Sequence, residues 1–266
     1  MPRPPIHLRY TEYGVGGAGP VVLLHGFPLT RAMWDETVPA LADTYHVIVP
    51  DLRGHGESEA TDGLYEMADH AGDVLALLDT LGHRQAAVVG LSMGGYILLQ
   101  LLTSAPERLW AVVLADTMGR ADIEERKQAR AAQAEIIKTE GLAKFAEQVL
   151  PRMFAPSVPA LRPELVERFR RTITSQQPES VVSALLGLAA RPDMIEPLKQ
   201  VRVPTLVIVG AEDLATTPEH AHELAATIPD ATLVILPGAG HMSNWEDSEG
   251  FNRAVRTFLD RTATSA

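Results

Sequence analysis

The chain has 266 residues, no cysteine and a formal net charge of −11. This length suits one α/β domain with a sizeable insertion, and the lack of cysteine excludes disulfides, thiolate metal sites and a cysteine nucleophile. A negative chain without a basic run repels phosphate backbones, so we expect no nucleic-acid partner.

The amino-terminal residues carry no recognisable targeting or membrane signal. Residues 1–10 contain three prolines and no apolar core of signal-peptide length. No stretch of the chain approaches the roughly 18 apolar residues that are needed to cross a bilayer. We therefore expect a cytoplasmic protein without a membrane partner, and the sequence indicates no oligomeric state.

Apolar runs and helical patterns alternate along the first part of the chain. A loosely alternating strand at residues 6–13, a glycine-rich turn at 14–20 and a strand at 21–24 predict a hairpin. Further elements are expected in this order: helix 34–42, strand 47–49, helix 71–81, strand 86–89, helix 94–103 and strand 109–114.

The same alternation returns near the carboxyl terminus. Strand 205–209, helix 218–228, strand 232–236 and helix 249–259 are expected there. Continuous apolar strands that alternate with helices are typical of a mostly parallel sheet with helices on both faces. The fold class is therefore α/β.

Residues 119–195 differ from the rest of the chain. Strand-like runs stop, and helical stretches such as 123–139 and 164–175 are separated by prolines. We interpret this segment as a helical cap, not an independent domain, inserted into a core of residues 1–118 and 196–266. A cap over the carboxyl ends of the strands would lie where ligands bind in such sheets.

The pentapeptide at residues 90–94, Gly-Leu-Ser-Met-Gly, indicates a nucleophile. It matches the G-x-S-x-G nucleophile elbow, and it stands between a predicted strand and a predicted helix, as that turn requires. Ser92 is therefore the candidate nucleophile. A serine needs a base within hydrogen-bond reach, and the base needs an acid that orients it.

The base is expected late in the chain, because this kind of site follows the order Ser, Asp or Glu, His. Beyond the cap stand His220, His222 and His241. The first two fall in a predicted helix, on its solvated side. His241 ends a glycine-rich loop after the last predicted strand, at the sheet edge that also carries Ser92, so His241 is the candidate base.

The acid is expected after the preceding strand. Asp213 is the candidate, with Glu212 as its neighbouring alternative and Asp116, which follows strand 109–114, as a third. The oxyanion would be bound by two backbone N–H groups. These are Met93, which follows the nucleophile, and Phe27, because the next residue, Pro28, has no N–H.

Two other patterns have less support. Residues 14–19 spell G-x-G-x-x-G, but a proline and a strand follow in place of the helix that a dinucleotide site requires. His220-x-His222 has no third ligand at a suitable spacing. We therefore expect no metal and no cofactor.

Five motifs taken together resemble the α/β-hydrolase superfamily. They are HGFP (25–28), DLRGHGES (51–58), GLSMGG (90–95), GAED (210–213) and GAGH (238–241). Residues 207–252 are similar to the 3-oxoadipate enol-lactonase group, whereas HGFP is closer to general carboxylesterases and cofactor-free haloperoxidases. The resemblance implies that the 51–58 loop, with Asp51 and His55, is structural and that His25 supports the oxyanion loop. A serine at the elbow argues against dehalogenases and epoxide hydrolases.

These observations predict a carboxylesterase that cleaves small to medium esters through an acyl-enzyme. The alternatives are 3-oxoadipate enol-lactonase or another lactonase, a perhydrolase, haloperoxidase-like enzyme or carbon–carbon hydrolase on the same triad, and a non-catalytic ligand-binding receptor of this fold. Arginines of the cap, such as Arg152, either receive a carboxylate of the substrate or are solvated helix charges; the second interpretation is favoured.

Overall fold

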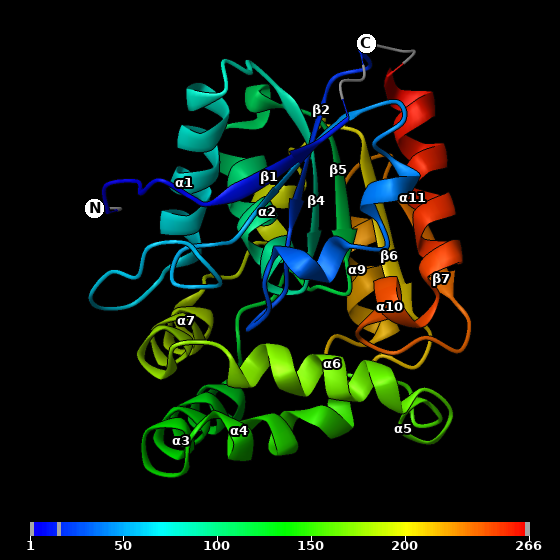
Figure 1. The fold of residues 1–266 in the computed structure, drawn as a ribbon. Helices are drawn as coiled ribbons and strands as arrows, with labels where there is room; N and C mark the ends of the chain where they lie inside the picture. The colour runs from blue at the N-terminus through cyan, green and yellow to red at the C-terminus, as the bar shows by residue number, and fades with distance from the viewer. Residues whose placement is uncertain (1–2, 15–16, 264–266) are drawn as a thin grey trace.

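The computed structural model describes residues 3–14 and 17–263, in which a seven-stranded sheet forms the centre (Figure 1). Across the sheet the strands are β1 (Tyr10–Tyr13), β3 (His46–Pro50), β2 (Pro20–Leu24), β4 (Ala86–Leu91), β5 (Leu109–Ala115), β6 (Thr205–Gly210) and β7 (Thr232–Leu236). Only β1 runs antiparallel to its neighbour. The predicted mostly parallel α/β architecture is confirmed.

The hydrophobicity of each strand matches its place in the sheet. Every residue of β4 and of β6 is buried, because both strands have helices on both faces. The edge strand β7 is half exposed. Continuous apolar runs such as Ala-Ala-Val-Val-Gly-Leu are what a central parallel strand requires.

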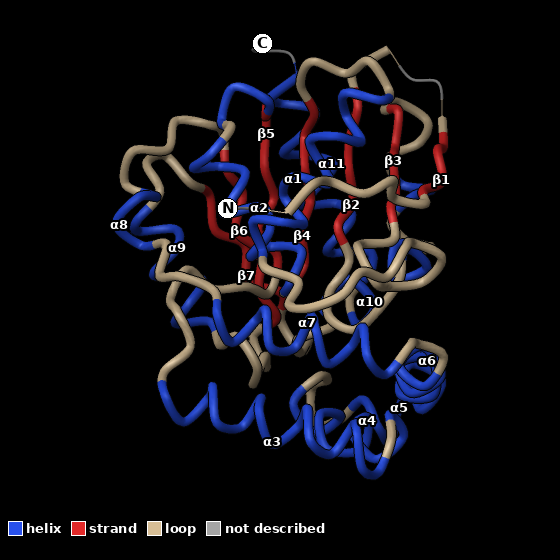
Figure 2. Tube along the Cα trace, turned by 90° about the vertical axis from the view of Figure 1, so that its left-hand side faces the viewer, coloured by secondary structure: helices blue, strands red, loops and turns tan. Residues whose placement is uncertain are grey.

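Helices cover both faces of the sheet (Figure 2). One face packs against α1 (Met67–Thr80), α2 (Met93–Ser104), α8 (Ile195–Leu198) and α9 (Pro218–Thr227). The other packs against α11 (Ser248–Ala263) and two short 3₁₀ helices, Arg31–Trp34 and Val38–Ala40. Within the described residues no helix is long and apolar enough to span a membrane.

Five helices form a separate layer beyond one end of the sheet (Figure 1). They are α3 (Glu124–Glu140), α4 (Leu142–Val149), α5 (Val158–Leu161), α6 (Pro163–Thr174) and α7 (Pro178–Ala190), and all come between β5 and β6. Phe145 and Phe169 of this layer belong to the same buried cluster as Leu91 of β4. The layer is therefore packed onto the core; the exact division at residues 119 and 195 stays a prediction.

Two local predictions were wrong. The first two strands do not form a hairpin, because β1 pairs with β3 while β2 pairs with β3 and β4; part of the expected turn, residues 15–16, lies outside the described residues. The helix expected at 34–42 is replaced by the two 3₁₀ helices. Pro39 stands in the middle of that segment and has no N–H to donate within a helix.

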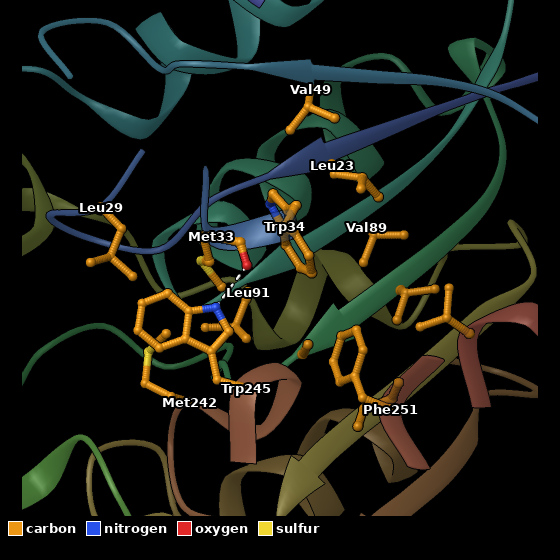
Figure 3. Close-up of a cluster of buried hydrophobic side chains, with 14 of the residues drawn as sticks. Leu23, Leu29, Met33, Trp34, Val49, Val89, Leu91, Met242, Trp245 and Phe251 are labelled. Atoms are coloured by element: carbon orange, nitrogen blue, oxygen red, sulfur yellow. Dashed lines mark hydrogen bonds between the residues drawn. The ribbon is translucent and has the colours of Figure 1, made fainter. Parts of the chain in front are cut away.

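A buried cluster anchors the segment after the last strand (Figure 3). Trp245, on α10 (Ser243–Glu246), donates its indole N–H to the carbonyl of Met33 at 2.8 Å. Its ring belongs to the same buried cluster as Leu91, the last residue of β4 (Figure 3). The end of β4 and the loop before α10 are therefore held in one apolar environment.

Candidate active site

Ser92 occupies the sharp turn between β4 and α2. Its backbone has φ 54 and ψ −110, a conformation that non-glycine residues rarely adopt. The neighbouring glycines permit the turn: a Cβ on Gly94 would lie 2.3 Å from the Leu24 carbonyl oxygen, and one on Gly90 would lie 2.4 Å from the Gly94 carbonyl carbon. Strand and helix therefore approach as closely as a nucleophile elbow requires.

His241 and Asp213 meet Ser92 at the carboxyl end of the sheet. The His241 Nε2 atom lies 3.0 Å from the Ser92 Oγ atom, and the His241 Nδ1 atom lies 2.8 Å from Asp213 Oδ2. All three residues come from loops at the carboxyl ends of strands, after β4, β6 and β7, and β5 lies between the first two of these strands. The geometry is that of a nucleophile, a base and an acid that orients the base.

Asp213 is held by more than His241. Its Oδ1 atom accepts hydrogen bonds from the amides of Ala215 (2.7 Å) and Thr216 (2.9 Å), and its Oδ2 atom accepts one from the Thr216 hydroxyl (2.7 Å). Glu212, the alternative acid, is exposed. The carboxylate that faces His241 is therefore fixed in place before any substrate binds.

The pKa values of Asp213 and His241 are shifted by their contact with each other. Burial acts to raise the pKa of Asp213, but His241 and the hydrogen bonds from Thr216 outweigh it and hold that pKa below its usual value. Burial acts to lower the pKa of His241, but the Asp213 carboxylate outweighs it and raises that pKa. An ionised Asp213 in this position would stabilise an imidazolium at His241.

The two expected oxyanion donors belong to Met93, which follows Ser92 in the chain, and to Phe27, which lines the same cavity as Ser92. Met93 is the first residue of α2, so its N–H has no acceptor within the helix. The Phe27 N–H, next to a cis Phe27–Pro28 bond, has no protein acceptor among the described residues. A donor pair of this kind suits an oxygen that gains charge during acyl transfer.

A cavity of about 140 Å³ opens onto Ser92 and His241. Its apolar wall joins the core to the cap and comprises Phe27, Phe145, Met153, Phe169, Leu185 and Leu188. Its polar wall comes from the cap and comprises Arg126, Arg130, Gln133, Gln148 and Arg152. The lining of this small pocket therefore combines apolar side chains with three arginines, here called the cationic wall, of which Arg126 and Arg130 also pair with Asp122.

Comparison with known proteins identifies the family of this fold. Residues 19–248 match the family model described as the alpha/beta hydrolase fold. The chain belongs to the α/β-hydrolase family. It is 32% identical to 3-oxoadipate enol-lactonase 2 of Acinetobacter baylyi, over 96% of this chain and 94% of that protein.

Solved structures place this α/β hydrolase near esterases and lactonases. A thermophilic esterase from Thermogutta terrifontis, with malate bound, is 39% identical with a TM-score of 0.92, covering 96% of this chain and 94% of that one. The enol-lactonase from Burkholderia xenovorans LB400 is 34% identical with a TM-score of 0.90, covering 95% and 96%. This chain is thus a hydrolase related to both groups.

The other histidines of the hydrolase lie outside the cavity lining. His25 Nδ1 donates to the Gly26 carbonyl and its Nε2 atom accepts the Leu52 amide, so the ring braces the oxyanion loop. Burial lowers the pKa of His25 to about 4 and that of His55 to about 3. His222 is exposed on α9.

No group of three His, Cys, Asp or Glu residues within residues 3–14 and 17–263 is arranged to hold a metal.

The sequence did not predict the contacts of several residues around the site. Glu246 accepts the amides of Gly240 and Met242, on either side of His241, and also the cap amide of Ala155. Nothing in the sequence near Glu246 indicates these hydrogen bonds, because the contact with the cap spans 91 positions.

Asp116, considered only as an alternative acid, is buried and contacts the loop that carries Asp213 and the loop that carries His241.

Proposed function

We propose that this α/β hydrolase is a serine hydrolase that cleaves small to medium carboxylic esters through an acyl-enzyme. The observation that carries the proposal is the continuous hydrogen-bond chain from Ser92 through His241 to Asp213, with distances of 3.0 and 2.8 Å. Its similarity to an esterase at 39% identity supports the same reaction class.

The proposed reaction uses groups that are already in position. Ser92 Oγ attacks the ester carbonyl while His241 Nε2 takes its proton, and the N–H groups of Phe27 and Met93 bind the oxyanion. His241 then gives the proton to the leaving alkoxide, and water releases the acid by the reverse route. Each oxyanion donor of this type contributes about 3–4 kcal/mol to the barrier reduction.

Size limits the substrate. A cavity of about 140 Å³ beside Ser92 favours a short acyl or alcohol group. We therefore expect turnover of p-nitrophenyl esters to fall as the acyl chain lengthens from C2 to C12.

The test compares the unchanged protein, Ser92→Ala and Ser104→Ala on that ester series. Ser104 lies exposed at the other end of α2, so it is a matched serine outside the site. Loss of turnover in Ser92→Ala alone is the expected result. Equal turnover in Ser92→Ala would refute the proposal, and turnover of no ester would leave acyl transfer, perhydrolysis or carbon–carbon cleavage to be tried next.

The second candidate is a lactonase for a substrate that bears a carboxylate. Arg126, Arg130 and Arg152 line the cavity, and Arg152 donates to the Leu214 carbonyl, with no carboxylate partner among the described residues. A guanidinium group of this kind suits a carboxylate of the substrate. Enol-lactonases among the relatives support this candidate.

Two substrates of similar size discriminate the candidates. Mono-p-nitrophenyl glutarate carries a free carboxylate and p-nitrophenyl pentanoate does not; 3-oxoadipate enol-lactone is assayed beside them. If the cationic wall recognises a carboxylate, Arg152→Gln raises KM for the anionic ester and lactone about 10-fold and leaves the neutral ester unchanged. Arg171→Gln, at an exposed cap arginine outside the cavity lining, is the control. An equal effect of Arg152→Gln on both esters would contradict carboxylate recognition.

A further inference from the structure

The turn that ends β5 touches the nucleophile loop. β5 lies between β4 and β6, so its exit turn, residues 115–117, stands between the loops that carry Ser92 and Asp213. The Ala115 carbonyl accepts the Ser92 amide at 2.9 Å, and the Thr117 hydroxyl donates to the Ser92 carbonyl at 2.9 Å. The β5 exit turn therefore fixes both backbone polar groups of Ser92.

The side chain of Asp116, in the middle of this turn, reaches the other two loops. Its Oδ1 atom accepts the Gly210 amide at 2.9 Å, three residues before Asp213. Its Oδ2 atom is hydrogen-bonded to the hydroxyl of Ser243, two residues after His241. The carboxyl group of Asp116 thus joins the loop that carries Asp213 to the loop that carries His241.

The backbone of Asp116 has an unusual conformation that its neighbours hold in place. Its φ is 44, and only Ser92 and Asp230 share a positive φ among the described non-glycine residues. Strained backbone persists only where surrounding contacts over-determine it, and such positions cluster at functional sites. Here the Asp116 amide also donates to the Ile208 carbonyl at 2.9 Å.

Asp116 and Asp213 differ in charge. Burial, and then the nearby Asp213 carboxylate, raise the pKa of Asp116 well above its usual value. Asp213 is instead kept ionised by His241. Two adjacent buried carboxyls cannot both ionise cheaply, so the one that faces His241 carries the charge and the other stays neutral.

We infer that Asp116 is a positioning residue: as a neutral carboxyl it ties the Asp213 loop and the His241 loop to the β5 exit turn, which itself holds Ser92. It does not touch the reacting atoms. The inference rests on the proposed function, because it assigns Asp116 a role in aligning that triad.

The test uses a fluorophosphonate that labels activated serines, together with ester kinetics, on intact protein. Asp116→Asn preserves both contacts: its Oδ1 atom accepts the Gly210 amide, and its Nδ2 group donates to the Ser243 hydroxyl oxygen as a neutral carboxyl with its proton on Oδ2 does. We expect its labelling rate to stay within about threefold of the unchanged protein. Asp116→Ala removes both ties and should lower kcat and the labelling rate about 10- to 100-fold with KM nearly unchanged, because small misplacements of catalytic groups slow the chemical step.

Ser243→Ala removes only the hydrogen bond between Asp116 and Ser243, and it should lower kcat and the labelling rate by less than Asp116→Ala does. The control is Thr205→Val, at the opposite end of β6, which removes a buried hydroxyl bonded to Val203 at 2.9 Å. It should lower the melting temperature without changing kcat. A purely structural role for Asp116 would give the same pattern as this control.

The outcomes separate the inference from the proposed function. If the unchanged protein is not labelled, or if Ser92→Ala is labelled equally, the proposed function fails and the inference fails with it. If labelling depends on Ser92 but Asp116→Ala reacts at the full rate, the inference alone is overturned. Should Asp116→Ala not fold, an unchanged rate in Ser243→Ala overturns it.

The pH profile tests the neutral state. Asp116→Asn should leave the acid limb of kcat/KM where it is, because a neutral carboxyl adds no charge beside His241. A shift of that limb to lower pH in Asp116→Asn would show that Asp116 is ionised. It would overturn the inference that a neutral Asp116 carboxyl joins the two loops.

Discussion

Replacement of His70 by leucine should make the protein more resistant to acid. His70 lies on α1 with no exposed surface, and neither ring nitrogen has a partner among the described residues. Burial, followed by the charges of nearby His55, Arg53 and His25, lowers the pKa of His70 well below 6.5. The folded protein therefore keeps this ring neutral in mild acid.

The sign and size of the effect follow from proton uptake. The unfolded chain binds a proton at His70 once the pH falls below 6.5, whereas the folded chain does not, so stability is lost as the pH falls. Between pH 7.5 and pH 5 this one residue costs about 2 kcal/mol of unfolding free energy. At pH 7.5 leucine should be nearly neutral, because it replaces unpaired polar atoms by apolar ones.

The assay is the melting temperature at both pH values. A difference of about 2 kcal/mol corresponds to roughly 4–8 °C in a chain of this size, so the advantage of His70→Leu over the unchanged protein should be larger at pH 5 by that amount. His222→Leu, on the exposed face of α9, is the matched control and should leave the pH dependence as it is. An equal shift of His70→Leu at both pH values would refute the reasoning.

Three further predictions test the site and its support. Asp213→Asn should lower kcat about 10⁴-fold with little change in KM, measured on a short ester, because His241 loses the group that orients it. Gly94→Ala should lower the free energy of unfolding in urea by about 1–3 kcal/mol, since its Cβ would lie 2.3 Å from the Leu24 carbonyl oxygen. Trp245→Phe removes the indole donor shown in Figure 3 and should cost about 1–3 kcal/mol in the same assay.

Each of these has its own check. Glu212→Gln, next to Asp213 but exposed, should keep its full kcat; a loss equal to that of Asp213→Asn would contradict the assignment of the acid. Gly72→Ala, in α1 where a Cβ meets nothing within 4 Å, should stabilise the protein by about 1 kcal/mol. Unchanged stability in Trp245→Phe would mean that its hydrogen bond contributes nothing net.

The sequence alone determined the features that depend on neighbouring residues. Apolar runs at 86–89 and 205–209 predicted buried parallel strands, and the structure buries all of β4 and β6. The pattern around Ser92 predicted a turn between strand and helix, since small flanking residues and a switch in periodicity are local signals. Chain order indicated His241 as the base and left Asp213, Glu212 and Asp116 as candidate acids; in the structure Asp213 lies within hydrogen-bond distance of His241, and His241 within that of Ser92.

Only the tertiary structure decided the features that depend on residues far apart in the chain. The pairing of β1 with β3 in place of a hairpin depends on which sheet edge is free, and no local pattern records that. Asp116 and Ser243 are 127 positions apart, so the tie between the triad loops appears only when β5 takes its place between β4 and β6. The cavity lining likewise forms only in the folded chain, because Arg126, Arg130 and Arg152 of the cap lie far from Ser92 in the sequence.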